Sequence, residues 1–277
     1  MVDAAVASQP KQDVLFGRSG LSEREAVALD VFPCLLDVAE AMLLSGADVH
    51  FVEEKLADIG RAYGAYKMNV FVITSSIIAT MTLPNGYEHT LTRRVIGEAS
   101  IDFDKVERLA TLCTEAGIEN YTYKELKARL KTIRTRTVPT WSLFLGGILS
   151  AGAFALFFGG SYLDAAVSAV FAVFICLALK FLRPWTPSTI IFNFLNSFLC
   201  GLGIMAVDSI WGGIAPDMVM IGDIMLLIPG VAMTNATRDM FSGDTVSGIM
   251  RFVESLLWAI ALALGFMAAI WLAQVIW

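Results

Sequence analysis

The stretch LLIPGVAMTNATRDMFSGD, residues 226–244, begins with apolar residues. A proline–glycine pair and several polar residues follow. A proline removes one backbone hydrogen bond from a helix and releases carbonyl groups. Pro229–Gly230 therefore predicts either a helix end or a broken, re-entrant helix. Broken helices of this kind form polar sites in membrane proteins. Arg238 and Asp239 follow closely, and an ordinary ion pair in a loop is the alternative interpretation.

Other polar side chains interrupt neighbouring apolar runs, where each one costs free energy in lipid. Asn193 and Ser197 are four residues apart and share one helix face, with Asn196 beside them. Asp223 lies upstream of the proline–glycine pair, and it is either a carboxylate near the membrane surface or an ion or proton site. Glu254 stands at the start of the last apolar run.

The composition indicates a membrane protein. Of the 277 residues, 56% are hydrophobic and 17% are charged, with a mean hydropathy of +0.66. Soluble domains carry roughly 25% charged residues. The charge is also unevenly placed, because residues 1–140 hold 16 of the 20 basic and 19 of the 26 acidic residues. A net charge of −6 argues against nucleic acid as a partner, since phosphate requires a basic surface.

Five apolar runs in the second half are about 20 residues long, which is the length that crosses a bilayer. The basic residues near these runs all lie before the first, between the second and third, or between the fourth and fifth. The positive-inside rule places those ends in the cytoplasm and the C-terminus outside the cell. The predicted membrane domain, 139–277, has spans near residues 141–159, 162–182, 188–207, 216–235 and 249–275.

The front half predicts a small α+β cytoplasmic domain at residues 21–138, after a mostly flexible tail at residues 1–20. Ser22 and Glu25 have the spacing of a capping box at the start of a first helix. Pro33 lies inside that helical pattern and predicts a kink or two separate helices. The predicted fold is thus an α-helical membrane protein, with five transmembrane helices preceded by a small α+β domain.

The rest of this domain alternates between helical and strand patterns. A second helix is expected from Asp48 to Gly64. A stretch rich in β-branched residues and an Asn85–Gly86 turn then predict three strands. Residues 102–117 and 122–136 return to helical spacing, and the second of these helices is strongly basic.

Residues suited to enzyme catalysis are sparse in this domain. His50 and Glu53 are three residues apart on one helix face, as metal ligands can be. The other histidine is His89, however, and the sequence contains no HExxH pair. We therefore expect surface or packing histidines, with no metal and no cofactor. The four cysteines show no CxxC spacing and are interpreted as buried free thiols.

Two stretches together carry a family resemblance. The segment LLIPGVAMTNATRDMFSGDTVSGIMRFVESLLWAIALALG resembles the signature of the threonine/serine exporter family, with its proline–glycine pair, Asn, Arg-Asp, Gly-Asp and Ser-Gly steps. LLSGADVHFVEEKLADIGRAYG, followed by VFVITSSIIATM, is similar to the cytoplasmic domain of that family. The resemblance covers roughly residues 30–270, in the same order.

The resemblance implies a layout and a class of substrate. Some family members carry ten spans in one chain, whereas others split into a larger subunit with five spans and a small membrane subunit. This chain is similar to the larger subunit, which implies a small membrane partner in the cell (inner) membrane; a homo-oligomer is the alternative. The family exports small polar acids, either threonine and serine or C4-dicarboxylates such as succinate. We expect export coupled to the proton gradient.

On this basis, chemistry assigns expected roles to the polar residues. The Arg238 cation would meet the substrate carboxylate, and Asn235 and Thr234 would add hydrogen bonds. Pro229, Gly230, Asn193 and Asn196 complete the expected substrate site, and Asp223, Asp239 and Glu254 are the candidate proton carriers.

Two other functions remain open at this point. One is a membrane-anchored enzyme with a catalytic cytoplasmic domain, although the sequence shows no nucleophile–base pair there. The other is a non-transporting assembly or sensor subunit that gates a partner through the front domain.

Overall fold

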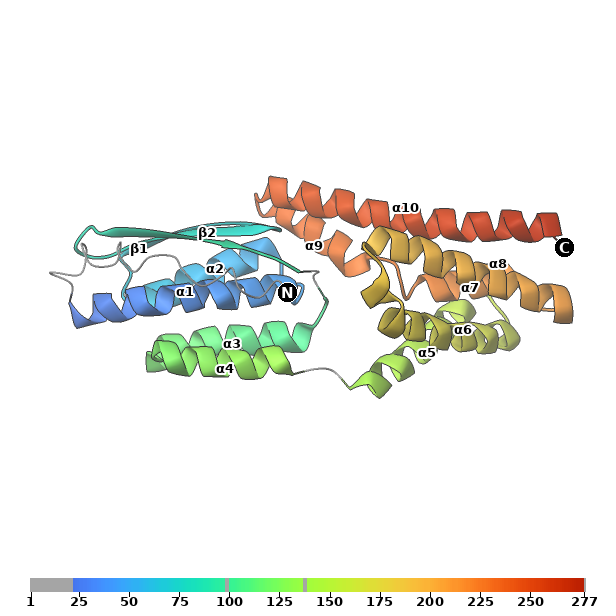
Figure 1. Ribbon diagram of the computed structural model, residues 1–277, viewed down its shortest axis with the longest axis horizontal. Coiled ribbons are helices and arrows are strands. Elements are labelled where there is room, and N and C mark those ends of the chain that lie inside the picture. The colour runs from blue at the N-terminus through green and yellow to red at the C-terminus, as the bar shows by residue number, and fades with distance from the viewer. Residues whose placement is uncertain (1–21, 98–99, 137–138, 277) are drawn as a thin grey trace, which may run out of the picture. The chain divides into compact units, whose positions relative to one another are not determined.

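A computed structural model describes residues 22–97, 100–136 and 139–276 (Figure 1). The expected tail at residues 1–20 lies outside the described residues, and so does the expected domain boundary at residue 138.

The chain divides into two compact units, and one of them is not continuous in sequence. The first unit is Met1–Arg136 together with Asp239–Ser247, and the second is Thr137–Arg238 together with Gly248–Trp277. A short segment from late in the chain therefore belongs to the same compact body as the front half.

The first unit has three layers (Figure 1). A three-stranded antiparallel sheet forms the first, α1 and α2 pack on one of its faces, and α3 and α4 cover the far side of these two helices. The expected order of helices and strands is confirmed. The elements are α1 (Glu23–Leu44), α2 (Val49–Ala62), β1 (Lys67–Ile73), β2 (Ser76–Thr82), β3 (Glu88–Arg94), α3 (Phe103–Glu119) and α4 (Tyr123–Thr135).

Local sequence explains where the first helices begin. The predicted capping box of α1 is confirmed, because the Glu25 carboxylate accepts the Ser22 N–H at 2.7 Å and the Ser22 hydroxyl accepts the Glu25 N–H. α2 begins after Asp48, whose carboxylate accepts the Phe51 N–H at 2.8 Å. α1 continues through Pro33 as one helix, so the predicted alternative of two separate helices is wrong. The side chains flanking this proline are buried, and their packing outweighs the lost hydrogen bond.

The sheet presents one face to the helices. β1 pairs with β2 and β2 with β3, both antiparallel. The predicted turn lies between β2 and β3, with Gly86 at a φ of 83° and the Asn85 side chain accepting the Tyr87 N–H at 2.9 Å. Along β2, odd-numbered residues are buried and even-numbered ones are at least partly exposed, as expected for a sheet covered on one face.

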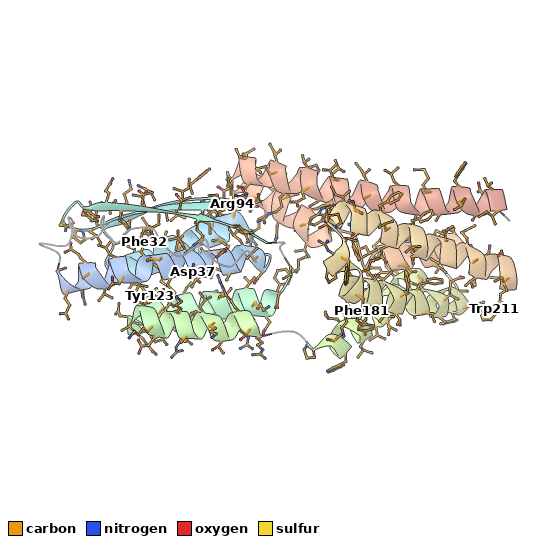
Figure 2. All side chains as sticks on the ribbon, viewed as in Figure 1. Phe32, Asp37, Arg94, Tyr123, Phe181 and Trp211 are labelled. Atoms are coloured by element: carbon orange, nitrogen blue, oxygen red, sulfur yellow. The ribbon has the colours of Figure 1, made fainter. Side chains whose placement is uncertain are left out.

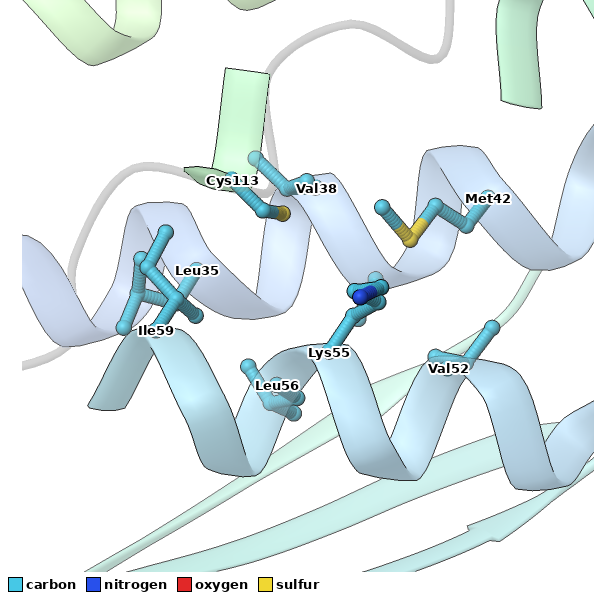
Figure 3. Close-up of a pocket in the computed structure, with 9 residues that line it drawn as sticks. Leu35, Val38, Met42, Val52, Lys55, Leu56, Ile59 and Cys113 are labelled. Atoms are coloured by element: carbon cyan, nitrogen blue, oxygen red, sulfur yellow. The ribbon is translucent and has the colours of Figure 1, made fainter. Parts of the chain in front are cut away.

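A small pocket lies in the core between α1, α2 and α3 (Figure 3). Its volume is about 10 Å³, which is close to the space that one water molecule needs. Its lining is apolar apart from Lys55 and Cys113, and burial raises the pKa of the Cys113 thiol to about 12. A cavity this small, beside a thiol that stays protonated, is a packing defect and not a substrate pocket.

The second unit is helical. Among the described residues, four helices are long and apolar enough to cross a membrane, namely α5, α6, α7 and α10. They lie at four of the five predicted spans. The predicted fourth span consists instead of two short helices, α8 and α9. The elements are α5 (Thr140–Phe157), α6 (Tyr162–Phe181), the short 3₁₀ helix η1 (Arg183–Trp185), α7 (Thr189–Trp211), α8 (Pro216–Ile224), α9 (Gly230–Phe241) and α10 (Thr245–Ile276).

Large apolar side chains cover the outside of this second unit. Leu149 is 64% exposed and Trp271 is 65% exposed, which suits a surface in contact with lipid. Figure 2 shows Phe181 and Trp211 at the ends of α6 and α7. Aromatic residues at such positions are typical of the boundary between lipid and water. The chain therefore has the features of a multi-pass membrane protein.

Candidate functional site

The predicted fourth span is broken near its middle. α8 ends at Ile224, and the N–H groups of Leu227 and Ile228 both donate to the Ile224 carbonyl, at 3.0 and 2.9 Å. Pro229 has no N–H, and it disfavours the helical conformation of the residue before it, so the helical ladder cannot continue. α9 begins at Gly230. The structure thus shows two short helices, separated by residues 225–229, where the sequence predicted one span.

A buried carboxylate lies beside this break. Asp223, in the last turn of α8, is 0% exposed. The Ser168 hydroxyl on α6 donates to its Oδ1 at 2.9 Å, and the Cys200 thiol on α7 donates to its Oδ2 at 3.5 Å. The C-terminal end of a helix carries negative partial charge, so α8 does not stabilise an anion here. This burial favours an ion or proton site over a carboxylate at the membrane surface.

Gly222 allows α8 to approach α5 and α6 closely. A Cβ atom at this position would lie 2.6 Å from the Ser168 Oγ and 2.7 Å from the Ala151 carbonyl oxygen. Neither distance is tolerated between non-bonded atoms, so any larger residue would push α8 away. The contact between Ser168 and Asp223 therefore depends on a glycine at position 222.

The two predicted asparagines lie on α7 in the same unit. Asn193 is 4% exposed and Asn196 is 0% exposed. Within the described parts of the chain, neither amide atom of Asn196 has a hydrogen-bond partner. A buried amide left in this way is costly, so water or a ligand is the expected partner. Cys200 follows Asn196 by four residues and contacts Asp223, so these polar groups share one face of α7.

The other predicted site residues of the second unit lie on α9 and α10. The Thr234 hydroxyl donates to the Gly230 carbonyl of its own helix at 3.0 Å. Asn235 is partly buried, whereas Arg238 and Glu254 are exposed. These residues therefore lie on other helices than Asp223 and its two hydrogen-bond donors, which belong to α8, α6 and α7.

Asp239, also predicted as a proton carrier, belongs to the first unit. Its side chain is 0% exposed, and its Oδ1 accepts the Val49 N–H at 3.0 Å. This N–H belongs to the first turn of α2, where a carboxylate is stabilised by the helix dipole. The structure thus places Asp223 and Asp239 in different units.

The sequence did not single out Asp164, Ser168 or Cys200 as part of a polar site. Asp164 is buried, and it accepts the Ser161 N–H at 2.7 Å and the Ala215 N–H at 2.7 Å. Its spacing from Ser161 is that of a helix cap, which could have revealed it. Ser168 and Cys200 have no such local signal, because their role depends on how α8 packs against α6 and α7.

Comparison with known proteins identifies a family and several related sequences. The family model described as "Putative threonine/serine exporter" matches residues 34–273. Two similar relatives are named "Probable succinate transporter subunit YjjP". The one from Klebsiella aerogenes is 27% identical over 251 residues, covering 90% of this chain and 94% of the relative. The one from Escherichia coli is 25% identical over 234 residues, covering 83% and 89%.

A third relative is a longer protein. The "Threonine/serine exporter" of Corynebacterium glutamicum is 22% identical over 290 residues, which cover 99% of this chain but 57% of the relative. No solved structure matches the chain. Because the family model covers most of the sequence, from the first helix of the front unit to the last apolar helix, this chain belongs to the threonine/serine exporter family.

Proposed function

We propose that this chain is one subunit of a proton-coupled exporter of small amino or carboxylic acids in the cell inner membrane. The relatives' names suggest either a C4-dicarboxylate such as succinate or the hydroxyl amino acids threonine and serine. The observation that carries the proposal is Asp223, a fully buried carboxylate at the break between α8 and α9. Broken helices of transporters hold substrates and coupling ions at such positions.

In this proposal α8 and α9 together make the fourth of five membrane crossings, interrupted at residues 225–229. The basic residues flanking the apolar helices support an N-terminus in the cytoplasm and a C-terminus outside the cell. An odd number of crossings is consistent with a transporter that a second membrane protein completes. The word subunit in the relatives' names supports such a partner.

Asp223 is the residue best placed to carry the proton. An ionised carboxylate surrounded by apolar helices is costly, and protonation removes that cost. Ser168 and Cys200 donate to its two oxygens and so hold the carboxylate in one orientation. Asp223 would take up a proton from outside the cell and release it to the cytoplasm. The substrate acid would move outward in exchange.

The substrate would be held by the polar groups of α7 and α9. Arg238 supplies a positive charge, with which a substrate carboxylate pairs strongly. Its side chain is exposed. The Asn196 amide offers a donor and an acceptor without leaving its buried position. Thr234 already donates its proton to Gly230, so its hydroxyl oxygen is left to accept a hydrogen bond from an amino group.

The test is export by cells that lack their own exporters for these acids, expressing this chain with a candidate small subunit. Asp223→Asn keeps the shape of the side chain but cannot release a proton. We expect it to reduce proton-driven export by at least about 100-fold, as for loss of an essential proton carrier.

Asp217→Asn is the matched control. Asp217 lies in the first turn of the same helix and is exposed, so the same chemical change there should leave export near the wild-type rate. Wild-type export by Asp223→Asn would place the coupling site elsewhere. Absence of export by the wild-type pair would favour an assembly or sensor role for this chain.

A further inference from the structure

The segment Asp239–Ser247, here called the α9–α10 loop, has a fixed local shape. Gly243 has a φ of 100°, and the Asp244 N–H donates to the Asp239 carbonyl at 2.9 Å. A glycine in the left-handed conformation followed by such a bond is the Schellman ending of a helix. The loop is therefore a compact helix stop and not a slack connection between α9 and α10.

This loop is bound at two separate points of the first unit. The Asp239 carboxylate accepts the Val49 N–H at the start of α2. At the other end of the loop, the Ser247 hydroxyl donates to the Val72 carbonyl of β1 at 3.2 Å, and Ser247 is 2% exposed. Two buried hydrogen bonds from the ends of a rigid loop fix both its position and its direction.

The same residue of β1 also binds α2 through its backbone N–H, on the same edge of the strand. The Val72 N–H donates to the Glu53 carboxylate of α2 at 2.7 Å. Val72 thus uses one backbone group to bind α2 and the other to bind Ser247. Because β1 is an edge strand, these two side chains take the place that a further strand would occupy.

A partly exposed set of charges surrounds the two hydrogen bonds. His50 Nδ1 lies 3.8 Å from the Asp244 Oδ2, and the His50 side chain is 55% exposed. Burial raises the pKa of Glu53, the Val72 N–H lowers it, and the nearby Asp244 and Asp239 carboxylates raise it further. The loop therefore brings two acidic side chains to the start of α2, where the helix dipole favours them.

We propose that the front unit serves to position the export site by gripping the α9–α10 loop through Asp239 and Ser247. This inference rests on the proposed function. Arg238 directly precedes Asp239 on α9, and neighbouring residues on a helix point about 100° apart. Fixing Asp239 against α2 therefore fixes the direction in which the Arg238 side chain leaves the helix. Asp239 is in this role a positioning residue, and its carboxylate does not exchange the coupled proton.

The experiment compares Asp239→Ala with Asp239→Asn in the full-length chain, co-expressed with its small subunit. Alanine removes the acceptor for the Val49 N–H, whereas the asparagine oxygen keeps it. We expect Asp239→Ala to speed amide exchange in peptides covering residues 48–52 at least about tenfold and to raise the apparent KM for export about tenfold. Asp239→Asn should restore both values to within about threefold of wild type.

A second variant and a control make the result decisive. Ser247→Ala removes the other hydrogen bond, and we expect faster exchange around Val72 with a similar rise in KM. Asp58→Asn is the control, because Asp58 is exposed on the same α2 helix and pairs with Arg61 of that helix.

Two results would overturn the inference. Loss of export in Asp239→Asn, with normal exchange at α2, would show that the carboxyl proton itself matters. An unchanged KM in Asp239→Ala and Ser247→Ala, despite faster amide exchange, would show that these two hydrogen bonds do not affect the export site. Failure of the proposed function is distinguishable from both, because the wild-type pair would then export nothing.

Discussion

The first unit has one continuous core of buried apolar side chains, whereas many large apolar side chains of the second unit point outward. Phe32 is 0% exposed in the first unit, and Trp271 is 65% exposed in the second. Buried polar groups also differ. In the first unit Asp48 and Asp239 satisfy the first turn of α2, so they serve the fold. In the second, Asp223 receives two side-chain donors from other helices and caps no helix N-terminus.

Buried carboxylates that serve the fold differ in their position on a helix from those that serve a function. A buried carboxylate at a helix N-terminus is explained by the hydrogen bonds it accepts. A buried carboxylate at a helix C-terminus, among apolar helices, is not explained by the stability of the fold. The latter is where a function is to be sought.

The largest effect is expected from Phe32, where the contrast between inward and outward apolar residues is sharpest. Phe32→Ala should reduce the unfolding free energy of the first unit by about 3–5 kcal/mol, because it leaves a cavity in a packed core. Denaturant titration of the purified full-length protein in detergent, followed by hydrogen exchange, would measure it. Trp271→Ala in the second unit should cost less than about 1 kcal/mol. Equal losses at both positions would contradict the contrast.

A smaller effect is expected at the close approach of α8 to α5 and α6. Gly222→Ala should destabilise the second unit by about 1–3 kcal/mol, because the added Cβ overlaps the Ala151 carbonyl oxygen. Thermal unfolding in detergent would report it as a lower midpoint. Gly146→Ala is the matched control, since a Cβ there would meet nothing within 4 Å. Similar midpoints for the two variants would argue against tight packing at position 222.

Replacing two buried carboxylates of the second unit should change the unfolding free energy in different ways. Asp164→Ala leaves the Ala215 N–H without its acceptor and should cost about 1–3 kcal/mol. Asp223→Leu replaces a buried ionisable group with an apolar one of similar size and should cost nothing or stabilise slightly. Unfolding by denaturant in detergent would compare them. A large loss of stability in Asp223→Leu would make that carboxylate structural, like those of the first unit.

The smallest effect concerns the pH dependence of the first unit. Burial raises the pKa of Glu53 above its ordinary value of 4.5. Ionisation is therefore harder in the folded state, so stability present below pH 4.5 is lost as the pH rises through the folded pKa. Glu53→Gln keeps an oxygen for the Val72 N–H and should flatten this decline. Unfolding midpoints of the two proteins between pH 4 and 8 would show it, and parallel curves would mean that Glu53 ionises normally.

Local patterns in the sequence predicted much of the front unit. The Ser22–Glu25 capping box, the start of α2 at Asp48 and the Asn85–Gly86 turn all depend on residues that are close in sequence. Pro33 was overestimated as a helix breaker, because the buried residues on both sides of it could not be weighed without the tertiary packing.

The polar site was harder to predict, since its members come from separate helices. Asp223 and the break at Pro229 were visible as polar or helix-breaking residues in an apolar run. Ser168 and Cys200 are ordinary residues of apolar helices until α8 brings a carboxylate to them. The attachment of Asp239 to Val49 joins residues 190 positions apart, and no local pattern encodes such a contact.

α10 is longer than a membrane crossing requires. At 1.5 Å per residue, its 32 residues extend roughly 48 Å, whereas a hydrocarbon core is about 30 Å thick. About 20 residues suffice for the crossing, and the last 20 residues of the helix carry no charge. The surplus is the first three turns, which hold Arg251 and Glu254. With its last 20 residues in a bilayer, α10 would carry Arg251 and Glu254 beyond the hydrocarbon core on one continuous helix.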